Sequence, residues 1–252
     1  MNPAPHERGR MNDGQTRTLM VVHIPKAAGT TLRIILERQY PQPRIFKIVN
    51  GIQQERHNLA ALAPEEKREL AAVFGHMCWG WHEELAEGQE YKYLTMLREP
   101  TERVLSLYAY CKLPRHYLKD AIKNMDLAEF VTSGITSVCD NGMVRQLCGA
   151  DRFLQHPGQD MLIPFGEVTS EHLDAAKRNL DDCSIVGIAE DFDGMLAACQ
   201  AQLGWRIPAY ENENVTHWPK PKLESLDQRM LEALEHYTRL DRELYEYAKG
   251  GR

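Results

Sequence analysis

The chain has 252 residues, of which 43% are hydrophobic and 26% are charged, the composition of an ordinary globular protein. Its formal net charge of −6 argues against a general nucleic-acid binder and against a protein that docks on anionic membranes, because neither polyanion would attract it over long range. No apolar run approaches the roughly 20 residues that a membrane helix needs. We therefore expect a cytoplasmic protein with no membrane span.

The six cysteines are spread along the chain with no CxxC or Cys/His spacing, so we predict free buried thiols and no structural zinc site. Residues 1–17 are polar and lack the apolar core of a secretion signal. They have little surface to bury, which predicts a disordered tail. No Gly/Ser-rich or Pro-rich linker divides the middle of the chain, so we expect one domain over residues 18–252.

Residues 18–24 (TLMVVHI) form a short, almost continuously apolar run, which is typical of a central parallel strand covered on both faces. A loop and a helix with apolar residues at helical spacing follow it. The same alternation continues, with strands expected at 44–49, 73–77, 91–97 and 184–188 and helices at 64–72, from 100, at 172–180, 192–204 and 226–248. The pattern predicts an α/β fold with a central, mainly parallel sheet flanked by helices, and an irregular segment at 205–224 of a kind that often covers a site.

The loop HIPKAAGTTL joins the first strand to its helix. Backbone N–H groups at the start of a helix carry partial positive charge, so the loop is suited to hold a phosphate. Lys26 adds a full charge, and the hydroxyls of Thr30 and Thr31 are donors. The lysine precedes Gly29, unlike the order in the nucleotide triphosphatase loop, which disfavours a metal-dependent ATPase. The alternative is a solvated lysine beside a plain helix entry.

The segment LREPTERVLSLYAY places Arg98 at a strand end and Ser106 on a helix that begins at Pro100. A guanidinium and a hydroxyl at this spacing are able to reach one anion. The alternative is that Arg98 pairs with Glu102 and that Ser106 is an ordinary helical residue.

HIPKAAGTTL resembles the 5′-phosphosulfate loop of the sulfotransferases that use PAPS (3′-phosphoadenosine-5′-phosphosulfate). It is most similar to the carbohydrate O-sulfotransferase branch, which includes heparan sulfate 2-O-sulfotransferase. The resemblance implies a P-loop nucleotide-kinase-like sulfotransferase fold, PAPS as co-substrate and no metal. Ala27 stands where the family often has Thr. The donor ligands that the resemblance implies are Lys26, Ala27, Ala28, Gly29, Thr30 and Thr31.

Two further segments resemble donor loops of the same family. LREPTERVLSLYAY is similar to its 3′-phosphate loop, which makes Arg98 and Ser106 the implied 3′-phosphate ligands, with Glu99 in place of the usual Asp. The late segment ENVTHWPKPK resembles a loop that closes over the nucleotide. Its candidate residues are Asn214, Thr216 and Lys220.

FGHMCWGWHEEL is similar to a segment of the 2-O-sulfating enzymes in which a histidine acts as general base. His76 aligns with that histidine, whereas Phe74 occupies the place of another histidine of the segment. If the role of the missing histidine is supplied elsewhere, His82 and Glu83 are the candidates. The alternative is that His76 is a hydrogen-bonded core residue.

The acceptor side has weaker signals. DNGMVRQLCG resembles a segment of bacterial members in which Asn141 and Arg145 would face the acceptor. A helix cap by Asn141 and a surface ion pair of Arg145 explain them equally well. Trp79 and Trp81 are candidates to stack on a sugar ring, with core packing as the alternative. SIVGIAEDFDGML resembles a late strand and helix of the family, in which Glu190 has a structural role.

The sequence therefore predicts transfer of a sulfuryl group from PAPS to a hydroxyl acceptor, with Lys26 and His76 as catalytic residues. The branch resemblance favours a sugar or polysaccharide acceptor. Two alternatives remain: a nucleotide-binding interaction module that has lost turnover, which the Phe74 substitution favours, and an ATP-dependent kinase-like phosphotransferase. The sequence does not indicate the oligomeric state.

Overall fold

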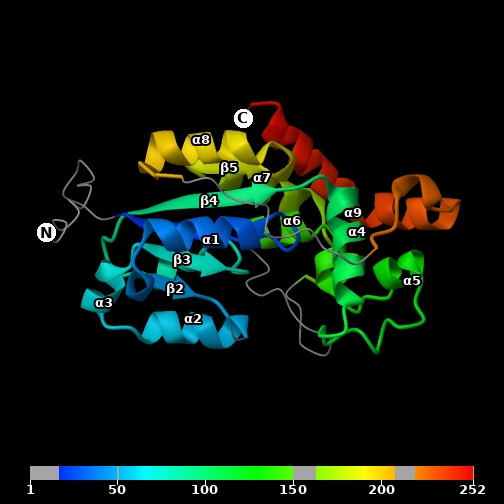
Figure 1. The fold of residues 1–252 in the computed structure, drawn as a ribbon, viewed down its shortest axis with the longest axis horizontal. Helices are drawn as coiled ribbons and strands as arrows, with labels where there is room; N and C mark the ends of the chain where they lie inside the picture. The colour runs from blue at the N-terminus through cyan, green and yellow to red at the C-terminus, as the bar shows by residue number, and fades with distance from the viewer. Residues whose placement is uncertain (1–16, 50, 150–162, 208–218, 252) are drawn as a thin grey trace, which may run out of the picture.

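A computed structural model describes residues 17–49, 51–149, 163–207 and 219–251. Within these ranges, five strands form one parallel sheet in the order β2-β3-β1-β4-β5 (Figure 1). The predicted α/β fold with a parallel sheet is confirmed, and each predicted strand is present. The strands are β1 (Thr18–Val22), β2 (Ile45–Lys47), β3 (Ala72–Gly75), β4 (Tyr91–Leu97) and β5 (Ile185–Ile188).

Helices cover both faces of the sheet, which explains why β1 is apolar at successive positions. Side chains alternate between the faces, so Leu19 and Val21 pack on one side and Met20 and Val22 on the other. The first face packs against α1 (Gly29–Gln39) and α8 (Phe192–Leu203). The second face packs against α2 (Ile52–Ala61), α6 (Gly142–Leu147), α7 (Ser170–Asp181) and α9 (Gln228–Lys249).

A third group of helices has its own apolar core. It comprises α4 (Pro100–Cys111), α5 (Leu127–Thr132) and the first half of α9, with Leu118 and Ile122 from the intervening segment. In Figure 1 these helices lie to the right of the sheet, the side toward which the strand arrows point. The carboxyl ends of the strands therefore face α4.

The six helices predicted from periodicity are all present, including α3 (Pro64–Glu69) and α4, which begins at Pro100 as expected. The sequence pattern did not predict α2, α5 (Leu127–Thr132) or α6. Two of these have six residues each, too short to show a helical period, and α2 is polar over most of its surface. Single 3-10 turns are η1 (Gln42–Arg44), η2 (Trp81–Glu84), η3 (Ser137–Cys139), η4 (Ala189–Asp191) and η5 (Leu223–Ser225).

A buried ion pair links the helices beside the strand ends. Arg103 on α4 donates to the carboxylate of Asp241 on α9 at 2.9 Å, and both side chains are fully buried. Asp241 also accepts hydrogen bonds from the backbone N–H groups of Met143 and Val144 at 3.2 and 2.9 Å. A single carboxylate thus joins α4, α6 and α9.

All six cysteines are buried thiols, as predicted. Among the helices in the described ranges, none has both the length and the apolar character needed to cross a bilayer. Within the same ranges, no three His, Cys, Asp or Glu side chains are grouped so that they could hold a metal ion. The predicted disordered tail falls outside the described residues, apart from Arg17.

Candidate functional site

Three adjacent strands, β3, β1 and β4, each end in a residue that the sequence predicts to be functional. His76 directly follows β3, the loop with Lys26 follows β1, and Arg98 directly follows β4. The strands are parallel, so their carboxyl ends meet at one edge of the sheet. The Arg98 guanidinium accordingly donates to the Lys26 carbonyl oxygen at 2.9 Å.

The loop after β1 has an unusual backbone. Lys26 and Ala28 have φ angles of 69° and 52°, in the left-handed region that costs a non-glycine residue roughly 1–2 kcal/mol. Ala28 is the N-cap of α1 and has no side-chain oxygen to accept bonds from the first turn. Thr30 and Thr31 lie in that turn. The strained loop and the uncapped helix start fit an anionic ligand.

Gly29 is required by close packing rather than by its φ angle. A Cβ atom built on Gly29 would lie 1.7 Å from Nε2 of His23, because the imidazole ring fills the space against the first turn of α1. Any side chain at this position would displace the ring. The loop glycine and the histidine before it therefore form one packing unit.

The Lys26 ammonium group lies over the ring of Tyr110 on α4, with Nζ 4.1 Å from the ring centroid. Burial, and after it the nearby Arg98 guanidinium, lowers the pKa of Lys26 to about 8. Opposite charge from a ligand would be stabilised here. Tyr110 holds the lysine on the side of the loop that faces α4.

Arg98 and Lys220, predicted donor ligands from distant parts of the chain, meet at one carboxylate. Arg98 Nη2 lies 3.6 Å from Oε2 of Glu102, the partner that the sequence left as an alternative, and the Lys220 ammonium bonds the same oxygen. Ser106 lies one turn further along α4 and is 5% exposed. Asn214 and Thr216 lie outside the described residues.

His76 is held in one tautomer by a backbone carbonyl. Its Nδ1 lies 2.8 Å from the carbonyl oxygen of His23, which only accepts, so Nδ1 carries the proton. In the neutral ring, Nε2 then has the lone pair. Burial lowers the pKa of His76, while its bond to the His23 carbonyl raises it. Gln146 donates to the same carbonyl at 3.0 Å and to that of Met77 at 2.8 Å, fixing both backbone segments.

His23 supplies a second imidazole beside His76. The two rings stack with centroids 4.2 Å apart, and the ring of Phe74 stacks on His23 at 5.4 Å. The pKa of His23 is well below its ordinary value, first because of burial and then because of His76. The imidazole next to His76 therefore comes from the loop strand and not from the position that Phe74 occupies.

His82 and Glu83, the rival candidates for the base, lie in a different part of the molecule. The His82 ring stacks on Tyr91 at 4.3 Å, and Tyr91 pairs with Thr18 at the start of β1. His23 is five residues further along β1, about 16 Å at the usual rise of a strand. Tyr91, on which His82 stacks, and Lys26 therefore lie at opposite ends of β1.

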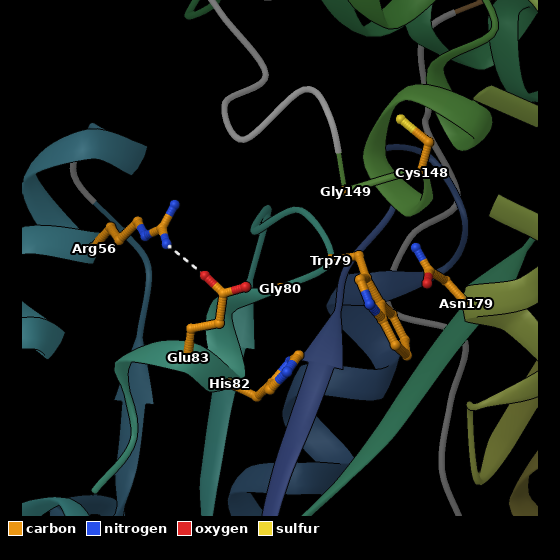
Figure 2. A pocket seen from close by; sticks show the side chains of 8 residues that line it. All are labelled: Arg56, Trp79, Gly80, His82, Glu83, Cys148, Gly149 and Asn179. Atoms are coloured by element: carbon orange, nitrogen blue, oxygen red, sulfur yellow. Dashed lines mark ion pairs between the residues drawn. The ribbon is translucent and has the colours of Figure 1, made fainter. Parts of the chain in front are cut away.

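His82 and Glu83 instead line a pocket of about 210 Å³, which Figure 2 shows with Arg56 pointing toward Glu83. The hydroxyl of Tyr93 lies 3.0 Å from His82 Nδ1. Burial lowers the pKa of His82 and the Glu83 charge raises it. The other lining residues are Trp79, Gly80, Cys148, Gly149 and Asn179.

Asn141 and Arg145 are engaged inside the protein and do not face an acceptor. The Asn141 side-chain oxygen accepts bonds from the N–H groups of Leu240 and Asp241. Arg145 is fully buried; it pairs with Asp140 and donates to the carbonyls of residues 163 and 164. The helix-cap position was anticipated for Asn141, but the ion pair of Arg145 is buried rather than superficial.

Trp81 is likewise a core residue, with 0% of its surface exposed, so it offers no ring face to a sugar. Trp79 is half-buried, stacks on Tyr93 at 3.9 Å and lines the pocket of Figure 2. Glu190 has the structural role expected for it. Its carboxylate accepts bonds from the N–H of Glu99 at 3.2 Å and the hydroxyl of Tyr245 at 3.0 Å.

Four residues of the site were not singled out from the sequence: His23, Tyr110, Glu102 and Gln146. His23 and Tyr110 stand inside the two motifs, and the signal for them was aromatic character at the ends of those motifs. Glu102 had been considered only as a partner that would argue against function. Gln146 gave no signal, because its role depends on which carbonyls the fold brings to it.

No protein-family model matches the chain, and no curated protein matches it in sequence. Among solved structures, the chain is similar to mouse sulfotransferase SULT7A1 complexed with PAP, with a TM-score of 0.38 and 15% sequence identity. The match covers 78% of this chain and 62% of that chain.

Proposed function

We propose that the chain is a sulfotransferase that moves a sulfuryl group from PAPS to a hydroxyl acceptor. One observation carries the proposal: Lys26, His76 and Arg98 lie at the ends of three adjacent parallel strands, at one edge of the sheet. Two of the three stand in motifs that resemble the donor loops of this family, and the third stands in the segment that resembles its base-bearing segment. Sequence order alone does not require these strands to be neighbours.

The donor side fits the residues present. The backbone N–H groups at the start of α1, with Lys26, would bind the 5′-phosphosulfate end of PAPS, which supplies an activated sulfuryl group. Arg98 and Lys220 would bind the 3′-phosphate through charge-assisted hydrogen bonds. The positive charge of Lys26 lies where the departing 5′-phosphate oxygen gains negative charge.

His76 would accept the proton of the acceptor hydroxyl at Nε2. The His23 carbonyl fixes the proton on Nδ1, so the neutral ring is oriented for this role before the acceptor arrives. The lowered pKa favours the neutral form at neutral pH. A proton gained at Nε2 would be stabilised by the bond that Nδ1 already makes.

A carbohydrate acceptor is proposed from the branch resemblance, with no support from Trp81, Asn141 or Arg145. The alternatives are a module that binds the nucleotide without turnover and a phosphotransferase that uses ATP. Isothermal titration of the full chain with 3′-phosphoadenosine 5′-phosphate (PAP), and separately with ATP and Mg²⁺, distinguishes the donor classes. We expect PAP to bind and ATP to bind at least tenfold more weakly, because ATP lacks the 3′-phosphate.

Turnover is then measured with sulfur-labelled PAPS against polysaccharides, small glycosides and phenols, by mass spectrometry of the products. Transfer of label to one acceptor class supports the enzyme. Tight PAP binding without transfer to any class would favour the module, and preferential ATP binding would overturn the donor assignment.

A further inference from the structure

The carboxylate of Glu102 holds two cations from distant parts of the chain. Arg98 stands at the end of β4, Glu102 in the first turn of α4, and Lys220 is 118 residues beyond Glu102. Both cations approach the same oxygen, Oε2, with Arg98 Nη2 at 3.6 Å and the Lys220 ammonium in direct contact. The carboxylate thus occupies the position between the two groups proposed to bind the 3′-phosphate.

This cluster is open to solvent. The side chains of Arg98, Lys220 and Glu102 are 25%, 33% and 40% exposed, so an ion in solution has access to them. The helix start does not depend on the Glu102 carboxylate, because the side chain of Glu99 accepts the bond from the Glu102 N–H at 2.7 Å. Glu102 is therefore free to turn toward water without uncapping α4.

A phosphate dianion satisfies the two cations better than this carboxylate does. It has two charges and three terminal oxygens, enough to bond a guanidinium and an ammonium separately, whereas Glu102 offers one oxygen to both. Carboxylate and phosphate repel each other at this distance, so they do not occupy the cluster together. Exposed ion pairs of this kind are weak, so displacing Glu102 has a modest cost.

We propose that Glu102 is a built-in competitor for the nucleotide 3′-phosphate, which pairs with Arg98 and Lys220 until the phosphate displaces it and so weakens the binding of PAP. The inference rests on the proposed donor site. In a catalytic cycle its effect is on product release, since PAP must leave before the next donor binds.

The test is isothermal titration of the full chain with PAP and with adenosine 5′-monophosphate, which lacks the 3′-phosphate. In Glu102→Gln the amide no longer competes, and we expect PAP to bind roughly three- to tenfold more tightly while the monophosphate changes less than twofold. In a Lys220→Met background the gain for PAP should shrink. Glu243→Gln is the matched control, because it removes an exposed carboxylate paired with Arg239 on α9 and should alter neither affinity.

Weaker PAP binding by Glu102→Gln would overturn the inference, since it would mean that Glu102 holds the cations in place for the ligand. An unchanged PAP affinity, or an equal gain for both nucleotides, would also overturn it. If neither the unaltered chain nor Glu102→Gln binds PAP, the proposed donor site itself fails. Binding of PAP by Glu102→Gln alone would support both.

Discussion

Arg98 and Arg103 stand five residues apart and pair with carboxylates in opposite surroundings. Arg103 and Asp241 are fully buried, and the Asp241 carboxylate also accepts two hydrogen bonds from the backbone of α6. Arg98 and Glu102 are partly exposed and 3.6 Å apart, beside a third charge on Lys220. The buried pair is shielded from solvent and fixes the helices around the site, whereas the exposed pair is able to exchange its carboxylate for a ligand.

The two pairs should differ most in their contribution to stability, which is tested by replacing the carboxylate of each pair with the isosteric amide. Asp241→Asn leaves Arg103 buried without a counter-charge, and we expect it to lower the free energy of unfolding by about 3–5 kcal/mol, a large part of the total for a typical domain. Glu102→Gln should change it by less than about 1 kcal/mol. Urea denaturation followed by circular dichroism measures both, and similar losses in the two variants would contradict the comparison.

His76 combines the two surroundings, because its Nδ1 is fixed by the His23 carbonyl and its Nε2 is proposed to meet the acceptor. His76→Ala should lower kcat roughly a hundredfold to ten-thousandfold while PAP affinity stays nearly unchanged. His82→Ala is the matched control, since it removes an imidazole that lines the pocket of Figure 2, whose lining residues do not include His76 or Lys26. If His82→Ala abolishes turnover and His76→Ala does not, with both proteins folded, the base is His82.

Lys26, like Arg98, is placed to pair with a ligand, because its ammonium group lies over the ring of Tyr110. Lys26→Ala should reduce turnover about a hundredfold or more, since it removes the charge placed near the departing oxygen. Lys177→Ala removes a lysine that also lies over an aromatic ring, 5.5 Å from the centroid of Tyr247, and should leave turnover intact. Turnover that survives Lys26→Ala within a few fold would show that the loop is wrongly assigned.

Arg98→Ala tests whether the exchangeable pair binds the 3′-phosphate. We expect PAP to bind more weakly by about 1.5–3 kcal/mol, while adenosine 5′-monophosphate is almost unaffected, because the guanidinium is proposed to contact only the 3′-phosphate. Titration calorimetry with both nucleotides gives the difference. Equal weakening of the two would mean that Arg98 acts on the loop through the Lys26 carbonyl instead.

The pH dependence of kcat/KM separates His76 from Lys26, because the two side chains titrate with opposite effects on turnover. Protonated His76 cannot accept a proton, so kcat/KM should rise with pH through its pKa, which burial places below the ordinary value of about 6.5. Lys26 loses its positive charge when it is deprotonated, so kcat/KM should fall as the pH rises through its pKa of about 8. Lys26→Arg keeps the charge at high pH and should remove the falling limb. A falling limb that persists in Lys26→Arg belongs to another group.

The sequence predicted the parallel sheet, and it placed three candidate site residues where strands end. Apolar runs such as residues 18–24 mark buried parallel strands, and the rule that ligands bind at the carboxyl ends of such strands brings Lys26, His76 and Arg98 to one edge. The assignment of Arg98 and Lys220 to one site also agrees with their shared contact at Glu102. Strand direction puts each of these residues at the carboxyl end of its strand, whereas the side-by-side order of β3, β1 and β4 is a property of the fold.

The sequence did not reveal which polar residues the fold would bury. Arg145 and Asn141 have the residue types of ligands, and their roles depend on Asp140, on α9 and on carbonyls about 18 residues away. The role of His23 could not be predicted for a different reason: the rings that it contacts, Phe74 and His76, belong to β3 and the residue after it. Contacts between segments distant in sequence decide these roles, and no local pattern records them.

The burial of all six thiols makes the chain ready for site-directed labelling. A cysteine introduced at Leu223, whose side chain is 52% exposed three residues after Lys220, would react with a maleimide fluorophore far faster than any native thiol. Its emission would then follow the segment that carries Lys220 in real time as nucleotide is added, without removal of a single native cysteine.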